Sequence, residues 1–174
     1  MRGEHGLGFP SSPRSVYDPA PISMALSVFD LLTADRINLF LASQSQDEAI
    51  SATTALLAPC PHVLDLPGFE RDILAREQVT STAVGNGVAF PHARTDCVGQ
   101  IVMSAGRSRE GIAFKNGEER VHFVFIIGTP KNMVREYLSL VGDLVRRVKQ
   151  VTVREELIRA ETVAEFLAGL RGGR

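Results

Sequence analysis

The run VHFVFII at positions 121–127 is apolar except for His122. Valine, isoleucine and phenylalanine favour β-strands. A nearly continuous apolar run is typical of a central strand that is covered on both faces. We therefore predict a buried strand over 121–127, in which His122 packs with its ring hydrogen-bonded rather than reacts.

We predict a second strand before this one and an amphipathic helix after it. Residues 101–105 are predicted to be extended. Residues 133–148 carry an apolar stripe at intervals of three and four, which predicts a long amphipathic helix. The stripe consists of Met133, Tyr137, Leu140, Val141, Leu144 and Val148.

The remaining chain alternates between strand and helix patterns. We predict a short first strand over 37–41, a helix that starts at Ser45 and ends before Pro59, and a second helix over 68–77. Residues 84–90 are predicted to be extended with a turn at 85–87, and Thr162 and Glu165 open a final helix with Gly169 near its end. This mixture indicates an α/β fold with helices on both faces of one sheet.

Composition limits the function classes. The 174 residues suit one domain, and the net charge of -1, from 19 basic and 20 acidic residues, provides no bulk attraction for nucleic acid or anionic membrane. Two cysteines cannot form a disulfide framework, and no apolar run reaches the length of a membrane span. We expect a cytoplasmic protein without nucleic-acid binding or membrane insertion.

The first 23 residues differ in composition from the rest. They are rich in Gly, Pro and Ser and show no apolar periodicity. Such a segment buries too little surface to offset the entropy of ordering it. We expect a disordered tail over 1–23 and one domain over 24–174.

The stretch REQVTSTAVGNGVAFPHAR at positions 76–94 contains the strongest functional signal. Gly85 and Gly87 permit backbone conformations that are closed to other residues. Pro91 stiffens the chain that leads into His92. A phosphoryl-carrying histidine needs one free ring nitrogen, a hydrogen bond that fixes the other, and nearby positive charge, which Arg76 and Arg94 supply here. On these features alone, a structural histidine at a strand end is an equally good interpretation of His92.

A family resemblance favours the phosphoryl carrier. The residues Arg76-Glu77, Ser81-Thr82, 85–89 and Pro91-His92 resemble the signature of enzyme IIA of the fructose–mannitol class of the phosphoenolpyruvate:sugar phosphotransferase system (PTS EIIA type 2). The nitrogen-regulatory enzyme IIA proteins share this signature. The similarity extends from about residue 26 to 170 and includes Phe29-Asp30-Leu31-Leu32.

The resemblance implies one mixed β-sheet flanked by helices, and phosphorylation of His92 by the histidine-containing phosphocarrier protein. It implies that Arg76 lies near His92 and that Thr82 and Asn86 bind the phosphoryl group or support the site. The phosphoryl group then passes to an enzyme IIB of a sugar permease or serves a regulatory target, with the nitrogen-regulatory type mildly favoured. We expect neither a cofactor nor a metal.

Two departures from the family pattern affect the mechanism. Thr80 and Ala83 stand where glycines are common. Tyr137 stands where many members carry a second histidine beside the phosphorylated one. A tyrosine hydroxyl makes a hydrogen bond but stays neutral near pH 7. Tyr137 therefore either approaches His92 as a neutral partner or points into the apolar stripe of its helix.

Other residues that could carry chemistry are interpreted as structural. Cys60 and His62 lack a second pair at zinc-finger spacing. Glu77 is interpreted as a surface or orienting residue. The alternative function is a non-enzymatic regulatory module, in which the surface around His92 docks other proteins with weak or no phosphorylation, and Tyr137 favours that alternative.

Overall fold

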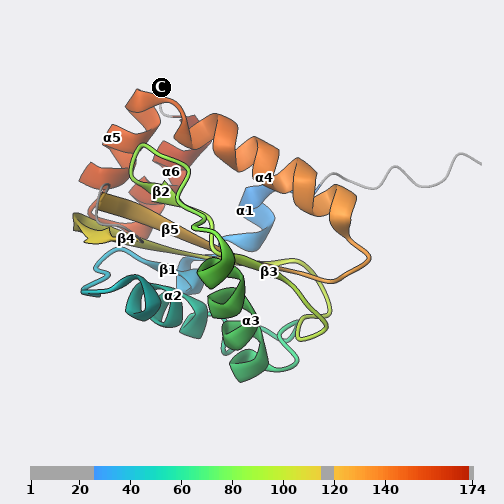
Figure 1. The fold of residues 1–174 in the computed structure, drawn as a ribbon. Coiled ribbons are helices and arrows are strands. Elements are labelled where there is room, and N and C mark those ends of the chain that lie inside the picture. The colour runs from blue at the N-terminus through green and yellow to red at the C-terminus, as the bar shows by residue number, and fades with distance from the viewer. Residues whose placement is uncertain (1–25, 115–119, 173–174) are drawn as a thin grey trace, which may run out of the picture.

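The central strand is β5 (Arg120–Thr129), which contains the apolar run 121–127. The structure is a computed structural model that describes residues 26–114 and 120–172. β5 runs antiparallel to β4 (Val102–Ala113) and parallel to β2 (Val88–Ala89) and β3 (His92–Arg94). β1 (Ile37–Asn38) adds to the other edge of β4 in parallel, so the order is β1-β4-β5-β2 with β3 also beside β5. The single mixed sheet is confirmed (Figure 1).

Helices cover both faces of this sheet, as predicted. The helices α1 (Val28–Leu31), α4 (Val134–Val148), α5 (Val151–Arg159) and α6 (Val163–Gly172) lie on one face. The helices α2 (Gln46–Ala55) and α3 (Leu66–Val79) lie on the other (Figure 1). Side chains of β5 alternate between the two cores: Phe125 and Ile127 face the first layer, while Val124 and Ile126 face the second.

Local capping determines where the helices of the second layer begin. The Ser45 hydroxyl accepts from the Glu48 N–H, which confirms the predicted start of α2. The Asp65 carboxylate accepts from the Gly68 N–H, and Pro67 occupies the first turn of α3. The helix predicted over 68–77 therefore begins two residues earlier and continues to Val79.

Two predicted strands differ in length from those in the structure, and one helix had no prediction. The strand expected over 101–105 is β4, which continues to Ala113 through a polar stretch, because Arg107 is buried there. The strand expected over 37–41 pairs only at residues 37 and 38. The helix α5 was not predicted, and Gly169 lies inside α6, where a Cβ would meet Glu156 of α5 at 3.0 Å.

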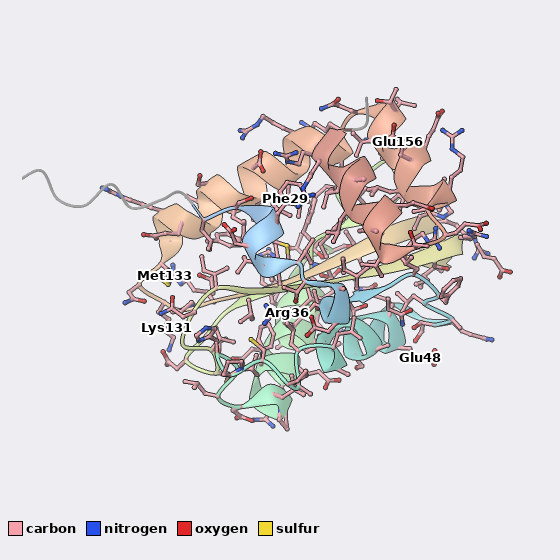
Figure 2. All side chains as sticks on the ribbon, turned by 180° about the vertical axis from the view of Figure 1, so that it is seen from behind. Phe29, Arg36, Glu48, Lys131, Met133 and Glu156 are labelled. Atoms are coloured by element: carbon pink, nitrogen blue, oxygen red, sulfur yellow. The ribbon has the colours of Figure 1, made fainter. Side chains whose placement is uncertain are left out.

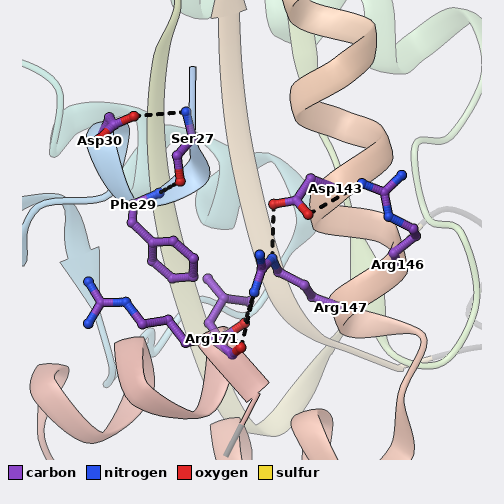
Figure 3. Close-up of polar contacts among 8 residues, drawn as sticks. Ser27, Phe29, Asp30, Asp143, Arg146, Arg147 and Arg171 are labelled. Atoms are coloured by element: carbon purple, nitrogen blue, oxygen red, sulfur yellow. Dashed lines mark hydrogen bonds and ion pairs between the residues drawn. The ribbon is translucent and has the colours of Figure 1, made fainter. Parts of the chain in front are cut away.

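The short helix α1 is fastened to the C-terminal helices by an aromatic ring between two cations. Arg147 and Arg171 lie with their guanidinium carbons 5.0 and 4.7 Å from the centroid of the Phe29 ring. Arg147 also donates to the Asp143 carboxylate and to the carbonyls of Leu170 and Arg171 (Figure 3). These contacts join α1, α4 and α6 into one layer.

The prediction of a disordered tail over 1–23 concerns residues outside those described. Within the described ranges, the helices are too short and too polar to cross a membrane.

Candidate functional site

His92 begins β3 at the end of the sheet where β5 terminates. Its backbone pairs with Ile127, two residues before the end of β5. The two residues before it are buried: the Phe90 ring stacks on Phe125 at 5.7 Å, and the Pro91 carbonyl accepts from the Ile127 N–H. The backbone that carries His92 is therefore held on the sheet, while its ring is half-buried.

One nitrogen of the His92 ring is occupied by the backbone. Nδ1 lies 2.9 Å from the carbonyl oxygen of Phe90. Because a carbonyl only accepts, the neutral ring carries its proton on Nδ1. The lone pair then lies on Nε2, which is the state that a nucleophilic imidazole requires.

The ring lines an open cavity of about 760 Å³ between α3, β3 and the first turns of α4. Arg76 of α3 and Tyr137 of α4 line the same cavity, and so does Arg94. The structure thus brings together His92, Arg76 and Tyr137, which are far apart in the chain.

Positive and negative side chains share this cavity. Arg76 and Arg94 are exposed, and Arg76 donates to the Thr80 carbonyl at 3.1 Å. Lys131 pairs with Asp96, whereas Asp72 accepts from the Thr95 hydroxyl at 2.5 Å. Lys131 lies next to Met133, where the chain enters α4 at one end of the molecule (Figure 2). Two of the three cavity cations, Arg76 and Arg94, therefore stay open to an anion.

Tyr137 lies beside His92 and also packs on the core. The two ring centroids are 5.7 Å apart with an angle of 36° between the planes. The same side chain packs against the core beneath α4. Burial raises the pKa of Tyr137 above its ordinary value of 10.0, although the charge of Arg76 opposes this. The hydroxyl is therefore neutral at physiological pH, and both predicted orientations are partly realised.

Thr82 and Asn86 lie elsewhere. Thr82 is buried, and its hydroxyl donates to Glu77 at 2.6 Å. Asn86 is exposed with a φ of 58° in the turn before β2. The neighbouring Gly87 carbonyl accepts from the N–H groups of His122 and Phe123, near the start of β5 and away from His92. Within the described part of the chain, the cavity lining includes neither Thr82 nor Asn86.

Glu77, Asp96 and Lys131 had no predicted place in the site. Glu77 is buried rather than on the surface, with 1% exposure. Arg94, expected to supply positive charge near His92, follows His92 by two in β3 and so shares its face of the strand. Asp96 and Lys131 had no local signal, because they meet through the packing of two connecting segments.

Comparison with known proteins agrees with this geometry. Residues 30–172 match the family described as "Phosphoenolpyruvate-dependent sugar phosphotransferase system, EIIA 2". The chain is 35% identical over 150 residues to the "PTS system fructose-specific EIIA component" of Haloferax volcanii, covering 82% of this chain and 97% of that protein. It is 27% identical to the "PTS system fructose-specific EIIABC component" of Bacillus subtilis, covering 79% of this chain but only 22% of that protein.

A solved structure shows the same fold. The nitrogen regulatory protein IIA-Ntr of Neisseria meningitidis superposes with a TM-score of 0.74 at 28% identity, over 81% of this chain and 97% of that one. The chain therefore belongs to the EIIA 2 family of the phosphotransferase system and is a phosphoryl-transfer component of that class.

Proposed function

We propose that this protein accepts a phosphoryl group on Nε2 of His92 from the phosphohistidine of the histidine-containing phosphocarrier protein. The observation that carries the proposal is the contact between Nδ1 and the Phe90 carbonyl, which leaves Nε2 as the nucleophile beside the cavity. The Nε2 lone pair forms a bond to phosphorus as the bond to the donor nitrogen breaks. The leaving imidazole takes back its electron pair, and the proton of His92 stays on Nδ1, where it is donated in a hydrogen bond to the Phe90 carbonyl.

Arg76 and Arg94 supply the charge that this transfer needs. Both line the cavity with exposed guanidinium groups. Charge-assisted hydrogen bonds to the phosphoryl oxygens stabilise the negative charge of the transferring group. The Tyr137 hydroxyl adds a neutral hydrogen-bond donor beside the ring.

A protein partner fits the rim of the cavity. Val134 and Leu138 line it and are 36% and 61% exposed. Exposed apolar side chains beside a reactive group favour docking of another protein. The proposed acceptor is an enzyme IIB, which the printed name of the Bacillus subtilis EIIABC relative supports. The likeness to IIA-Ntr supports a regulatory target of the nitrogen type as the other acceptor. Both reactions belong in the cytoplasm.

A second candidate function rests on Tyr137. Its neutral hydroxyl stands where many family members carry a second histidine, a side chain that can take a positive charge. A regulatory module that docks partners through the same rim, with weak or no phosphorylation, is the function that this substitution favours.

Intact-mass measurement after incubation with phosphoenolpyruvate, enzyme I and the phosphocarrier protein tests the proposal. We expect the wild type to gain the mass of one phosphoryl group and His92→Gln to gain none. His122→Gln is the matched control, because His122 is also half-buried and places Nδ1 3.0 Å from a backbone carbonyl, that of Ser108. Phosphorylation that survives in His92→Gln, or is absent from the wild type, contradicts the proposal.

A further inference from the structure

Glu77 is a buried carboxylate in the last turn of α3. The carboxyl end of a helix carries partial negative charge, so a carboxylate there is unfavourable. Burial adds a further cost unless hydrogen bonds replace the lost water. A carboxylate that stands at a helix end despite both costs needs compensating hydrogen bonds, and its partners show what it holds in place.

Hydrogen bonds to Glu77 come from one turn of chain and from one neighbouring helix. The Thr82 N–H donates to Oε1 at 2.9 Å, and the Thr82 hydroxyl donates to Oε2 at 2.6 Å. The side-chain amide of Gln46, at the start of α2, donates to Oε1 at 2.7 Å. Glu77 thus fixes the position of Thr82 relative to α3 and α2.

The position of Thr82 is transmitted to His92 by two more hydrogen bonds. The Phe90 N–H donates to the Thr82 carbonyl at 3.1 Å. The Phe90 carbonyl then accepts from Nδ1 of His92 at 2.9 Å. The path from Glu77 through Thr82 and Phe90 therefore ends on the ring nitrogen that determines the tautomer of His92.

The same segment also holds Arg76. Thr80 directly follows the last residue of α3, two residues before Thr82, and its carbonyl accepts from the Arg76 guanidinium. The adjacent side chains of Arg76 and Glu77 therefore both bind the segment 80–82. The contacts of Arg76 and, through Phe90, of His92 thus depend on the position of one segment.

We propose that Glu77 is a positioning residue for phosphoryl transfer, acting through Thr82 and Phe90 on the His92 ring and through Thr80 on Arg76. The inference rests on the proposed function of His92. It assigns to a buried carboxylate the alignment of the two groups that meet the phosphoryl group.

The test compares four variants of the full chain by rate of phosphorylation and by the ¹⁵N chemical shifts of the His92 ring. Glu77→Ala removes the carboxylate that accepts the hydrogen bonds of Thr82 and Gln46. Glu77→Gln keeps most of this geometry, because its amide oxygen can replace Oε1 as an acceptor and its NH₂ can donate to the Thr82 hydroxyl in place of Oε2. Thr82→Val removes only the hydroxyl contact and is the variant to use if Glu77→Ala does not fold. Glu70→Ala is the matched control, because Glu70 joins the same helix to α2 through Ser51 and lies outside the path to His92.

We expect Glu77→Ala to slow phosphorylation roughly tenfold and Thr82→Val about threefold, since small misplacements of reacting groups cost this much or more. Both should shift the ¹⁵N resonances away from a single Nδ1-protonated tautomer. Glu77→Gln should recover most of the rate, and Glu70→Ala should match the wild type. Wild-type rates and shifts in Thr82→Val and in folded Glu77→Ala would overturn the inference, as would an equal loss in Glu70→Ala.

The NMR readout separates this inference from the proposed function. If the wild type is not phosphorylated, the proposed function fails, whereas the ring shifts of Glu77→Ala still report whether Glu77 determines the tautomer. If the wild type is phosphorylated and the variants behave like it, only the positioning inference fails.

Discussion

The His92 cavity and the middle of strand β4 differ in how each uses an arginine. In the cavity, Arg76 of α3 is exposed and donates to the carbonyl of Thr80. In the middle of β4, Arg107 is fully buried and makes five hydrogen bonds to four backbone carbonyls. These carbonyls belong to Leu39, which follows β1, and to Leu157, Ile158 and Ala160 at the end of α5.

The difference shows how to tell a structural cation from a ligand-binding one. The carbonyls at the end of α5 carry the negative end of the helix dipole, so they offset the charge of Arg107 without a carboxylate. Burial and the nearby charge of Arg109 lower the pKa of Arg107, while Glu161 opposes them. The donors of Arg107 are taken up within the fold, whereas the guanidinium of Arg76 is exposed in the cavity and accessible to the proposed phosphoryl group.

The largest expected effect on stability comes from the buried arginine. Arg107→Met should lower the free energy of unfolding by about 3 kcal/mol, because it leaves several buried carbonyls without a donor. Urea unfolding followed by circular dichroism measures the change. Arg109→Met is the control: its ion pair with Glu161 spans 3.9 Å between exposed side chains and should contribute at most about 0.5 kcal/mol. Equal losses in the two variants would remove the distinction between a buried and an exposed arginine.

The exposed arginine should affect transfer instead of stability. Arg76→Met is expected to slow phosphorylation of His92 on the order of 100-fold, which is the usual effect of removing one donor that stabilises developing charge. Its unfolding free energy should stay within about 1 kcal/mol of the wild type. Arg71→Met, an exposed arginine of the same helix, should change neither quantity. A normal transfer rate in Arg76→Met would mean that the charge of Arg76 has no part in the reaction.

Tyr137 should have a smaller effect in the same cavity. Replacing it by histidine adds a ring that can carry positive charge beside His92, and a charged hydrogen bond exceeds a neutral one by about 1 kcal/mol. We expect Tyr137→His to speed phosphorylation or prolong the phosphorylated state roughly fivefold, and Tyr137→Phe to shorten it modestly. Quenched-flow transfer and the decay of the phosphorylated mass provide the measurement. If neither variant differs from the wild type, Tyr137 serves only to pack against the core.

The smallest expected effect is on alkaline stability. Burial raises the pKa of Tyr137 in the folded state above its value of about 10 in the unfolded state. The neutral form therefore stabilises the fold fully below pH 10, and this contribution is lost as the pH rises through the folded pKa. Between pH 9 and about 11, the wild type should lose slightly more unfolding free energy than Tyr137→Phe does. Identical pH profiles would show that the hydroxyl ionises equally in the two states.

Local patterns were sufficient for the elements whose burial follows a simple rule. The apolar run 121–127 predicted β5, because a strand covered on both faces is apolar almost throughout. The stripe over 133–148 predicted α4, because burial of one helix face imposes the helical period. Glycine, proline and histidine at 85–92 resemble the family signature and predicted His92 as the phosphoryl carrier. The polar half of β4 escaped prediction, since a buried charge such as Arg107 looks like a solvated turn until its distant carbonyl partners are known.

The sequence by itself determined the fold class, the family and the identity of His92 as the candidate carrier. Only the tertiary structure decided which side chains share its cavity: Arg76 and Tyr137 line it, whereas Thr82 turns its hydroxyl to Glu77 and Asn86 lies in the turn before β2. The reason is physical. Periodicity and special residues report on backbone conformation, which is local, while hydrogen-bond partners and open charges depend on which segments the sheet brings together.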